Sequence, residues 1–264
     1  MVGFTEYIDA AQVVLYAFWI FFAGLIYYLR REDKREGYPL ESDRNARTSR
    51  VKVVGFPAPP EPKTYRLPNG QGDRTAPHAE TITGEIPGAK PVAPWFGAPL
   101  APTGDPMVDG VGPASYPQRD DVPDLAASGL PRVIPMRLAE GFDVEHKDPD
   151  PRGFSIKAAD GQIVGEVVEL WVDRSEPRIL FYEIKLAADY AGDSTTNALL
   201  PYGFAVVKFR RRQINVASLM GKHFRTVPRT ASMDQITRLE EDRITAYYSS
   251  GHLYAHPSRS EPLI

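Results

Sequence analysis

The chain has 264 residues, a net charge of −3 and no cysteine. The missing cysteines exclude disulfide frameworks and thiol chemistry, and the nearly balanced charge excludes the strongly basic surface of a nucleic-acid-binding protein. A chain of this length holds one large domain or two small ones. Its 25 prolines concentrate between Pro57 and Pro135, so we expect an extended segment in that part of the chain.

Residues 10–29 contain no charged side chain. About 20 helical residues at 1.5 Å each cover roughly 30 Å, the thickness of the bilayer hydrocarbon. An apolar run of this length satisfies its backbone hydrogen bonds in lipid only as a helix. We therefore predict a transmembrane helix over residues 10–31.

Charge is distributed unequally around this helix. The acidic residues Glu6 and Asp9 precede it, and four basic residues follow: Arg30, Arg31, Lys34 and Arg35. The positive-inside rule then places residues 1–9 in the periplasm and the rest of the chain in the cytoplasm. We expect the four basic side chains to lie at the lipid headgroups. A cleaved signal peptide has its positive charge before a shorter apolar run, so the helix is predicted to stay as an anchor.

One face of the predicted helix has the spacing of a contact surface. Its members recur every three or four residues: Gln12, Tyr16, Trp19, Ala23 and Tyr27. Trp19 falls near the middle of the membrane, where its N–H gains from an acceptor on a neighbouring protein helix. A lipid-facing Trp19 without a partner is the alternative.

Residues 32–131 have no lasting helical period and are rich in proline and glycine. A disordered linker is one interpretation. The spaced aromatic residues favour the other, a chain laid across the surface of a partner protein: Phe56, Tyr65, Trp95, Phe96 and Tyr116. Residues 63–67, followed by Pro68, Asn69 and Gly70, predict a short strand and a hairpin turn.

Residues 132–230 change in character, because short β-branched runs alternate with turns. Strands are predicted over residues 133–138, 154–158, 162–172, 178–186, 204–209 and 213–217, with Gly165 as a possible bulge. Long βαβ helices are missing, so we predict a small antiparallel barrel or sandwich.

Residues 231–264 contain the last predicted element. Residues 232–249 indicate a C-terminal helix, capped by Ser232 or Asp234 and ended by Gly251. The predicted fold is thus a single N-terminal transmembrane helix, a mainly β domain and a C-terminal helix.

Recognised catalytic motifs are missing from the chain. His252 and His256 have a spacing that can bind a metal, but they flank the end of the predicted helix beside Pro257, so no metal site is expected. Asp173 and Glu176 follow the strongest predicted strand. One interpretation is that they lie in a solvated turn. The other is that a partner protein covers them, which raises the pKa values of their carboxyl groups and lets them carry protons.

Five segments in order resemble the H subunit of the photosynthetic reaction centre of purple bacteria: residues 30–40 with the anchor before them, and residues 101–114, 150–153, 169–176 and 239–254. The resemblance implies a non-catalytic subunit with one transmembrane helix and a PRC-type barrel. Such a subunit caps the cytoplasmic faces of the L and M subunits in the inner, intracytoplasmic membrane. The complex holds bacteriochlorophyll, bacteriopheophytin, quinones and non-haem iron, none of them bound by the H subunit itself. Light-harvesting antenna polypeptides are further candidate partners of the helix.

The resemblance also implies that the chain helps to conduct protons to the secondary quinone. Glu176 and Asp173 match carboxylates on this route, and Met136 matches a methionine near it. In some relatives an Asp and two His residues take up the proton, but Ala126, Ser128 and Leu130 stand at these positions here. Asp120, Asp121 or Asp124 are possible substitutes. A membrane-anchored PRC-barrel adaptor unrelated to photosynthesis is the alternative function.

Overall fold

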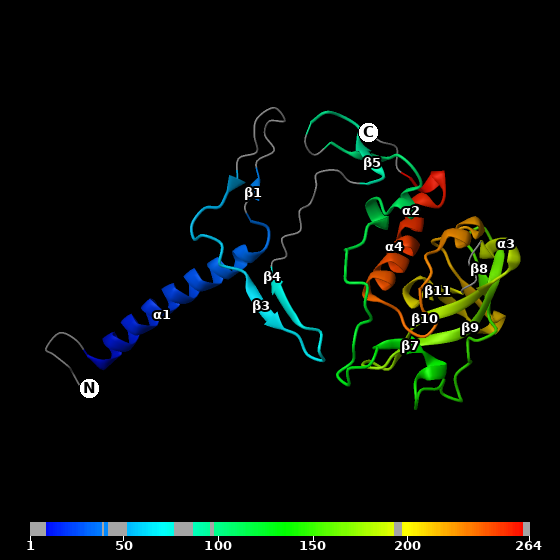
Figure 1. Cartoon of the computed structure of the whole chain (residues 1–264), viewed down its shortest axis with the longest axis horizontal. Helices are drawn as coiled ribbons and strands as arrows, with labels where there is room; N and C mark the ends of the chain where they lie inside the picture. The colour runs from blue at the N-terminus through cyan, green and yellow to red at the C-terminus, as the bar shows by residue number, and fades with distance from the viewer. Residues whose placement is uncertain are drawn as a thin grey trace. The chain divides into compact units, whose positions relative to one another are not determined.

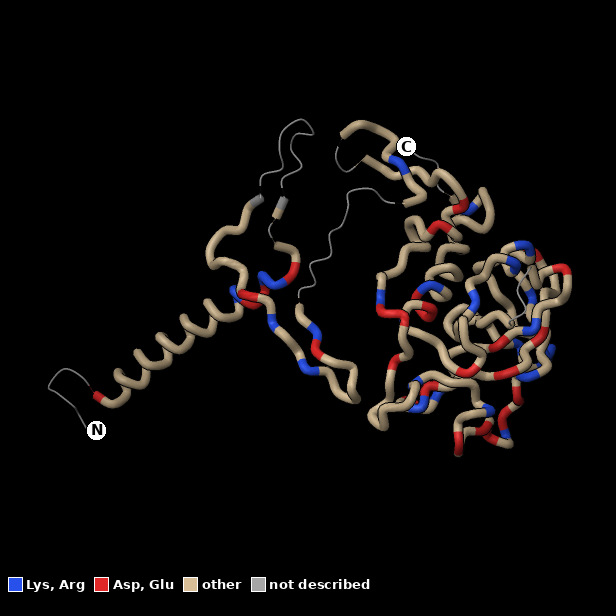
Figure 2. Tube along the Cα trace, in the orientation of Figure 1, with Lys and Arg blue, Asp and Glu red and all other residues tan. Residues whose placement is uncertain are grey.

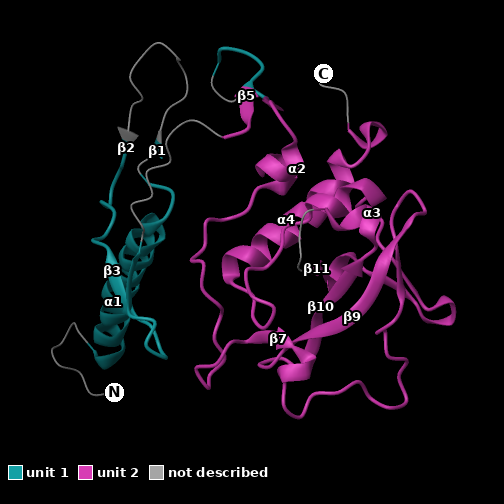
Figure 3. Ribbon diagram, turned by 45° about the vertical axis from the view of Figure 1, so that its right-hand side comes forward, with its two compact units in different colours: residues 1–84, 91–99 teal, residues 85–90, 100–264 magenta. Residues whose placement is uncertain are grey.

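The computed structural model describes residues 9–38, 40–41, 52–76, 87–95, 98–192 and 197–260. Predictions for Glu6, for Phe96 and for the rest of the segment 1–8 lie outside the described residues. The chain divides into two compact units (Figure 3), and each is described by itself. Unit 1 comprises Met1–Gly84 and Pro91–Pro99, and unit 2 comprises Glu85–Lys90 and Leu100–Ile264.

The predicted transmembrane helix is α1, Ala10–Glu32. Asp9 caps its start, because its carboxylate accepts a hydrogen bond from the Gln12 N–H, and the Asp9 N–H donates in turn to the Gln12 side-chain Oε1. A 3-10 turn, Asp33–Arg35, extends the helix, and Gly37 follows with a φ of 73°. Figure 2 shows α1 as uncharged between an acidic residue at its start and a cluster of charges at its C-terminal end. No α1 residue is buried, so the whole apolar surface is available to lipid or to a partner.

Short antiparallel pairs make up the rest of unit 1. Strand β1, Leu40–Glu41, pairs with β2, Lys52–Val53, and β3, Lys63–Arg66, pairs with β4, Asp73–Ala76. Asn69 and Gly70 both have positive φ values at the β3–β4 turn, which gives the twist that a hairpin needs. The hairpin predicted at this turn is confirmed. At the boundary of the units, β5, Ala89–Pro91, pairs with β6, Leu100–Pro102.

Unit 2 is built on a curled half-barrel sheet of seven strands (Figure 1). The sheet has the order β11-β10-β9-β8-β13-β12, and β7 pairs with the C-terminal part of β9. The strands and the short helix α3 have these bounds: β7 Val133–Pro135, β8 Ser155–Lys157, β9 Ile163–Asp173, β10 Arg178–Leu186, α3 Ala188–Ala191, β11 Ala198–Pro201, β12 Val206–Lys208 and β13 Gln213–Asn215.

The described strand pairs are antiparallel as predicted, with one exception. Strand β13 runs parallel to β8, with Ile214 opposite Ile156. The difference arises because β9, β10 and β11 form a meander to one edge of the sheet, and the β12–β13 hairpin returns the chain to the open edge of β8. Hairpin-scale sequence patterns do not specify a pairing made at such a distance.

The bulge predicted at Gly165 lies at the preceding residue, Val164. Ile156 pairs with Gly165 and Lys157 with Ile163, so Val164 is the extra residue between β8 and β9. Gly165 has a different role. A Cβ there would collide with the Lys185 carbonyl oxygen, so glycine permits β9 and β10 to approach closely.

The C-terminal helix α4, Arg238–Tyr254, begins and ends later than predicted. Its cap is Thr237, which forms a capping box with Glu240, and neither Ser232 nor Asp234 serves as the cap. Gly251 lies inside the helix and does not end it. A Cβ at this position would be 2.5 Å from the Ser218 carbonyl oxygen. The glycine therefore allows α4 to pack closely on the loop that follows β13. Ile244, Tyr247 and Tyr248 of α4 are buried in the core of unit 2.

Residues before the β sheet also belong to unit 2. Helix α2, Pro106–Asp109, and the 3-10 turn Gly112–Ala114 pack against α4. They bury the side chains of Met107, Val111 and Ala114. The stretch that we expected to cover a partner, residues 32–131, thus packs in its last third on its own chain.

Candidate functional site

The turn between β9 and β10 contains the two carboxylates that the sequence singled out. Asp173 ends β9 and is 2% exposed. Its Oδ1 accepts hydrogen bonds from the Ser175 N–H at 2.8 Å and the Glu176 N–H at 3.2 Å. These bonds fix the turn by the Asx geometry that short polar side chains favour. Asp173 therefore sets the backbone position of Glu176.

Glu176 lies on the outside of this turn. Its side chain is 70% exposed, and its Oε2 lies 3.3 Å from Nη2 of Arg178, the first residue of β10. An exposed ion pair of this kind contributes little to stability. The Glu176 carboxylate is therefore free to meet a partner surface.

Arg132 connects the turn to the segment before β7. Its Nε lies 3.3 Å from Asp173 Oδ2, and its Nη1 lies 2.6 Å from Asp124 Oδ2. The main chain adds to this link, because the Arg174 N–H donates to the Arg132 carbonyl and the Arg174 guanidinium donates to the Pro131 carbonyl. Arg132 was not predicted as a site residue, since no local spacing in the sequence joins residues 124, 132 and 173.

Met136 follows β7 and is buried. It lines a cleft of about 300 Å³ together with Val172, Pro177 and Ile179. The structure thus brings Met136 to the same end of β9 as the carboxylate turn.

Residues 126–130, which stand where some relatives have an Asp and two His residues, form a tight turn. The Ala126 N–H donates to the Leu130 carbonyl, and Leu130 is exposed. All three acids suggested as substitutes are engaged: Asp124 with Arg132, Asp120 with Arg238, and Asp121 with Thr237.

Glu241 on α4 is a second charged group that was not predicted as a site residue. Burial raises the pKa of Glu241, and Asp242 and Asp124 act in the same direction, whereas Arg132 and Arg119 act against it. The signal available from the sequence was the acidic pair Glu240 and Glu241. Glu240 has a structural role, because its carboxylate accepts from the N–H groups of Ala231 and Thr237.

The basic residues after α1 divide into two groups. Arg30 and Arg31 are exposed, as headgroup contacts require. Lys34, also predicted at the headgroups, is 3% exposed and donates to the carbonyls of Val54 and Pro57. Arg35 binds Glu32 and the Glu61 carbonyl. Short-range charge patterns do not reveal the contacts with Val54, Pro57 and Glu61, because these acceptors are carbonyl groups 20 or more residues along the chain.

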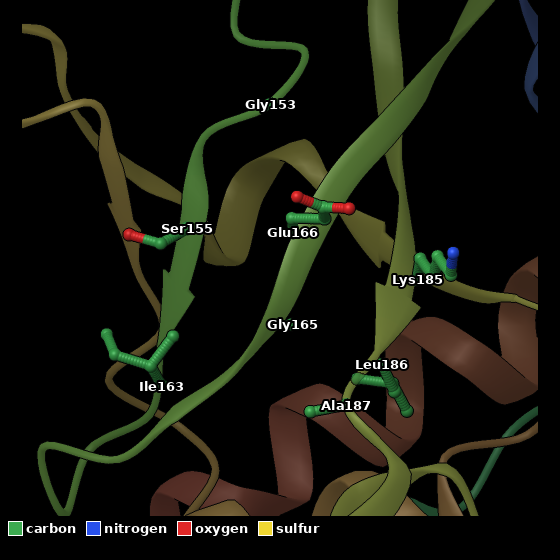
Figure 4. Close-up of a pocket in the computed structure, with 8 residues that line it drawn as sticks. All are labelled: Gly153, Ser155, Ile163, Gly165, Glu166, Lys185, Leu186 and Ala187. Carbon is green, nitrogen blue, oxygen red and sulfur yellow. The ribbon is translucent and has the colours of Figure 1, made fainter.

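The remaining features do not form a further chemical centre. Within the described part of the chain, no three His, Cys, Asp or Glu side chains gather as a metal site would require. A hollow of about 370 Å³ beside β8, β9 and β10 (Figure 4) is lined by one carboxylate, Glu166, and one ammonium, Lys185. These two residues are cross-strand partners on neighbouring strands of the sheet.

Two family models match the chain. Residues 2–138 match "Photosynthetic reaction centre, H-chain N-terminal region", which is more than half of the sequence, and residues 143–221 match the PRC-barrel domain. The first match leaves no basis for an adaptor unrelated to photosynthesis. The second match covers β8 to β13 and confirms the predicted barrel class. The chain belongs to the H-chain family of the photosynthetic reaction centre, whose members are structural subunits anchored in the membrane and associated with other reaction centre subunits.

Proposed function

We propose that this chain caps the cytoplasmic side of the L and M subunits, stabilises the quinone sites and helps to conduct protons to the secondary quinone. Its helix crosses the photosynthetic inner membrane with the N-terminus in the periplasm. The face of Gln12, Tyr16, Trp19 and Ala23 lies toward a partner helix, and Arg30 and Arg31 lie at the headgroups. Membership of the family and the exposed apolar surface of α1 support this arrangement.

Glu176 is the proposed proton carrier, and Asp173 is its support. The observation that carries this assignment is the geometry of the β9–β10 turn. A buried Asp173 accepts two backbone N–H bonds and fixes the turn, while the Glu176 side chain is exposed at its outer edge. A partner that covers such a turn excludes water, and exclusion of water favours the protonated form of a carboxyl group. A carboxyl group in that setting gains and loses protons near neutral pH.

The substitution Glu176→Gln tests this assignment in the assembled reaction centre. Glutamine keeps the shape of the side chain but does not titrate. We expect the second electron transfer to the secondary quinone to slow by up to about 10²-fold, the lower end of the range for a positioned proton-transfer group. The deficit should grow toward high pH, where protons are scarce. Flash-induced absorption changes measured as a function of pH report this rate.

Glu140→Gln is the matched control, because Glu140 is another exposed carboxylate of the same unit and lies outside the β9–β10 turn. It should leave the rate unchanged at every pH. Equal rates in the wild type and in both variants would remove Glu176 from the route.

A further inference from the structure

Lys34, just beyond the end of α1, has an unusual environment for a lysine beside a membrane-spanning helix. Its ammonium donates to the Val54 carbonyl at 2.8 Å and to the Pro57 carbonyl at 2.6 Å, and it lies 4.9 Å from the centre of the Tyr38 ring. An ammonium is buried at acceptable cost only where acceptors replace its water. The two carbonyls and the ring supply that replacement, so they fasten the loop of residues 53–57 to the end of the helix.

The two carbonyls flank Gly55 and Phe56. Gly55 has a φ of +65°, and a Cβ there would lie 3.6 Å from Lys34 Nζ. Glycine takes this left-handed conformation without strain, so the backbone turns over the ammonium. The Phe56 side chain is left 84% exposed, more than any other large hydrophobic side chain in the described ranges. Its ring centroid lies 5.9 Å from that of Tyr27 on α1.

The surroundings of Phe56 have the composition of a membrane interface. Val53, Val54, Tyr27 and Tyr28 are all exposed near it in the chain or on the helix. The exposed cations Arg30 and Arg31 follow within one turn of Tyr28. Aromatic rings with Arg side chains next to the end of a spanning helix are typical of the boundary between acyl chains and headgroups. Transfer of an aromatic side chain from water into an apolar environment is favourable, so a Phe56 ring left in water would forgo this stabilisation.

We propose that the loop of residues 53–57 is a second membrane contact, with the Phe56 ring inserted among lipids at the acyl–headgroup boundary and Lys34 as the clamp that holds it there. The contact is continuous with the apolar surface of α1, which identifies lipid as the occupant. The proposal requires only that α1 spans a membrane. It holds for either orientation of the chain and does not depend on proton conduction.

The chain has no cysteine, so Phe56→Cys introduces a unique attachment point for a nitroxide label. The variant is assembled into the reaction centre in lipid nanodiscs. The complex without the Phe56→Cys substitution is treated with the same label, so that any signal from other subunits is known and subtracted. Two reference positions calibrate the depth: Leu15→Cys within the helix and Glu36→Cys at an exposed position beyond it. Power saturation of the paramagnetic resonance signal measures access of oxygen, which enters lipid, and of a water-soluble nickel chelate.

The expected result at position 56 is high oxygen access with loss of nickel access, as at position 15 and opposite to position 36. Nickel access equal to that at position 36 would place the loop in water and overturn the proposal. A label protected from both reagents would show that a protein partner covers Phe56, which also overturns it.

Lys34→Met in the Phe56→Cys background tests the clamp. Methionine keeps the length of the side chain and removes its donors. The label should become more mobile and gain nickel access. An unchanged signal would show that Lys34 does not position the loop. Phe56→Cys alone decides the membrane contact if the double variant does not assemble.

Discussion

At the scale of single residues, the carboxylate turn depends on charges drawn from three separate segments. Arg132 lies between Asp124 and Asp173, and Glu241 on α4 faces the charges of Arg132, Asp124 and Asp242. Burial removes the water that stabilises carboxylate charges, and a single arginine replaces only part of that stabilisation when several carboxylates surround it. Burial is the largest influence on Glu241, and it raises the pKa of this carboxyl group.

The raised pKa of Glu241 has a defined effect on stability. A carboxyl group with a raised pKa in the folded state binds its proton more tightly there than in the unfolded state. The free energy of unfolding therefore falls as the pH rises above 4.5, the ordinary value, through the raised value. Glu241→Gln should increase the stability of the full chain at neutral pH and flatten this slope, with little effect at pH 4. Urea unfolding by circular dichroism at several pH values measures both. Glu140→Gln, on an exposed residue, should reproduce the wild-type slope.

At the scale of elements, the strands with continuous β-branched runs were the most predictable. The predicted strand over residues 178–186 coincides with β10, and that over residues 162–172 differs from β9 by one residue at each end. The boundaries of α4 were wrong by several residues, because a local pattern does not show that Gly251 faces the Ser218 carbonyl. Asp173 and Glu176 were candidates from the sequence, whereas Arg132 and Glu241 were not, because only tertiary folding brings Arg132 and Glu241 near the other charges.

Gly251→Ala distinguishes the two interpretations of this glycine. In an exposed helix, alanine stabilises by about 1 kcal/mol relative to glycine. Here the new Cβ would meet the Ser218 carbonyl oxygen at 2.5 Å and Leu219 Cδ2 at 2.6 Å. We therefore expect a loss of about 1–3 kcal/mol from overpacking, measured by thermal or urea unfolding. Gly203→Ala is the control, because nothing lies within 4 Å of a Cβ at that position. A stabilising effect of Gly251→Ala would contradict the close contact between α4 and the loop after β13.

At the scale of the whole molecule, the chain joins two units of different kinds. Unit 1 contains α1, which buries no residue, and short hairpins, whereas unit 2 contains a continuous hydrophobic core. The structural boundary near residue 100 precedes the change in sequence composition at residue 132. The reason is that Met107, Val111 and Ala114 come from a proline-rich stretch without strand or helix periodicity and yet fill the space beside α4.

Two fragments test this boundary. A fragment of residues 100–264 should unfold cooperatively, because it keeps this packing. A fragment of residues 132–264 should be less stable than the longer fragment by about 3–6 kcal/mol, because it lacks the buried side chains of Met107, Val111 and Ala114. Trp171 is buried and is the one tryptophan in either fragment, so its fluorescence in urea reports unfolding of the core. Equal midpoints would show that residues 100–131 contribute nothing to the core.

The parallel pairing of β13 with β8 has a consequence for biosynthesis. The β9–β10–β11 meander joins neighbours in sequence, so it can form while the ribosome is still translating the following codons. Strand β8 must wait until Gln213–Asn215 has left the exit tunnel before its second edge is hydrogen-bonded. A nascent polypeptide released before that point would present the bare edge of β8 to other chains, which is the kind of template that nucleates aggregation.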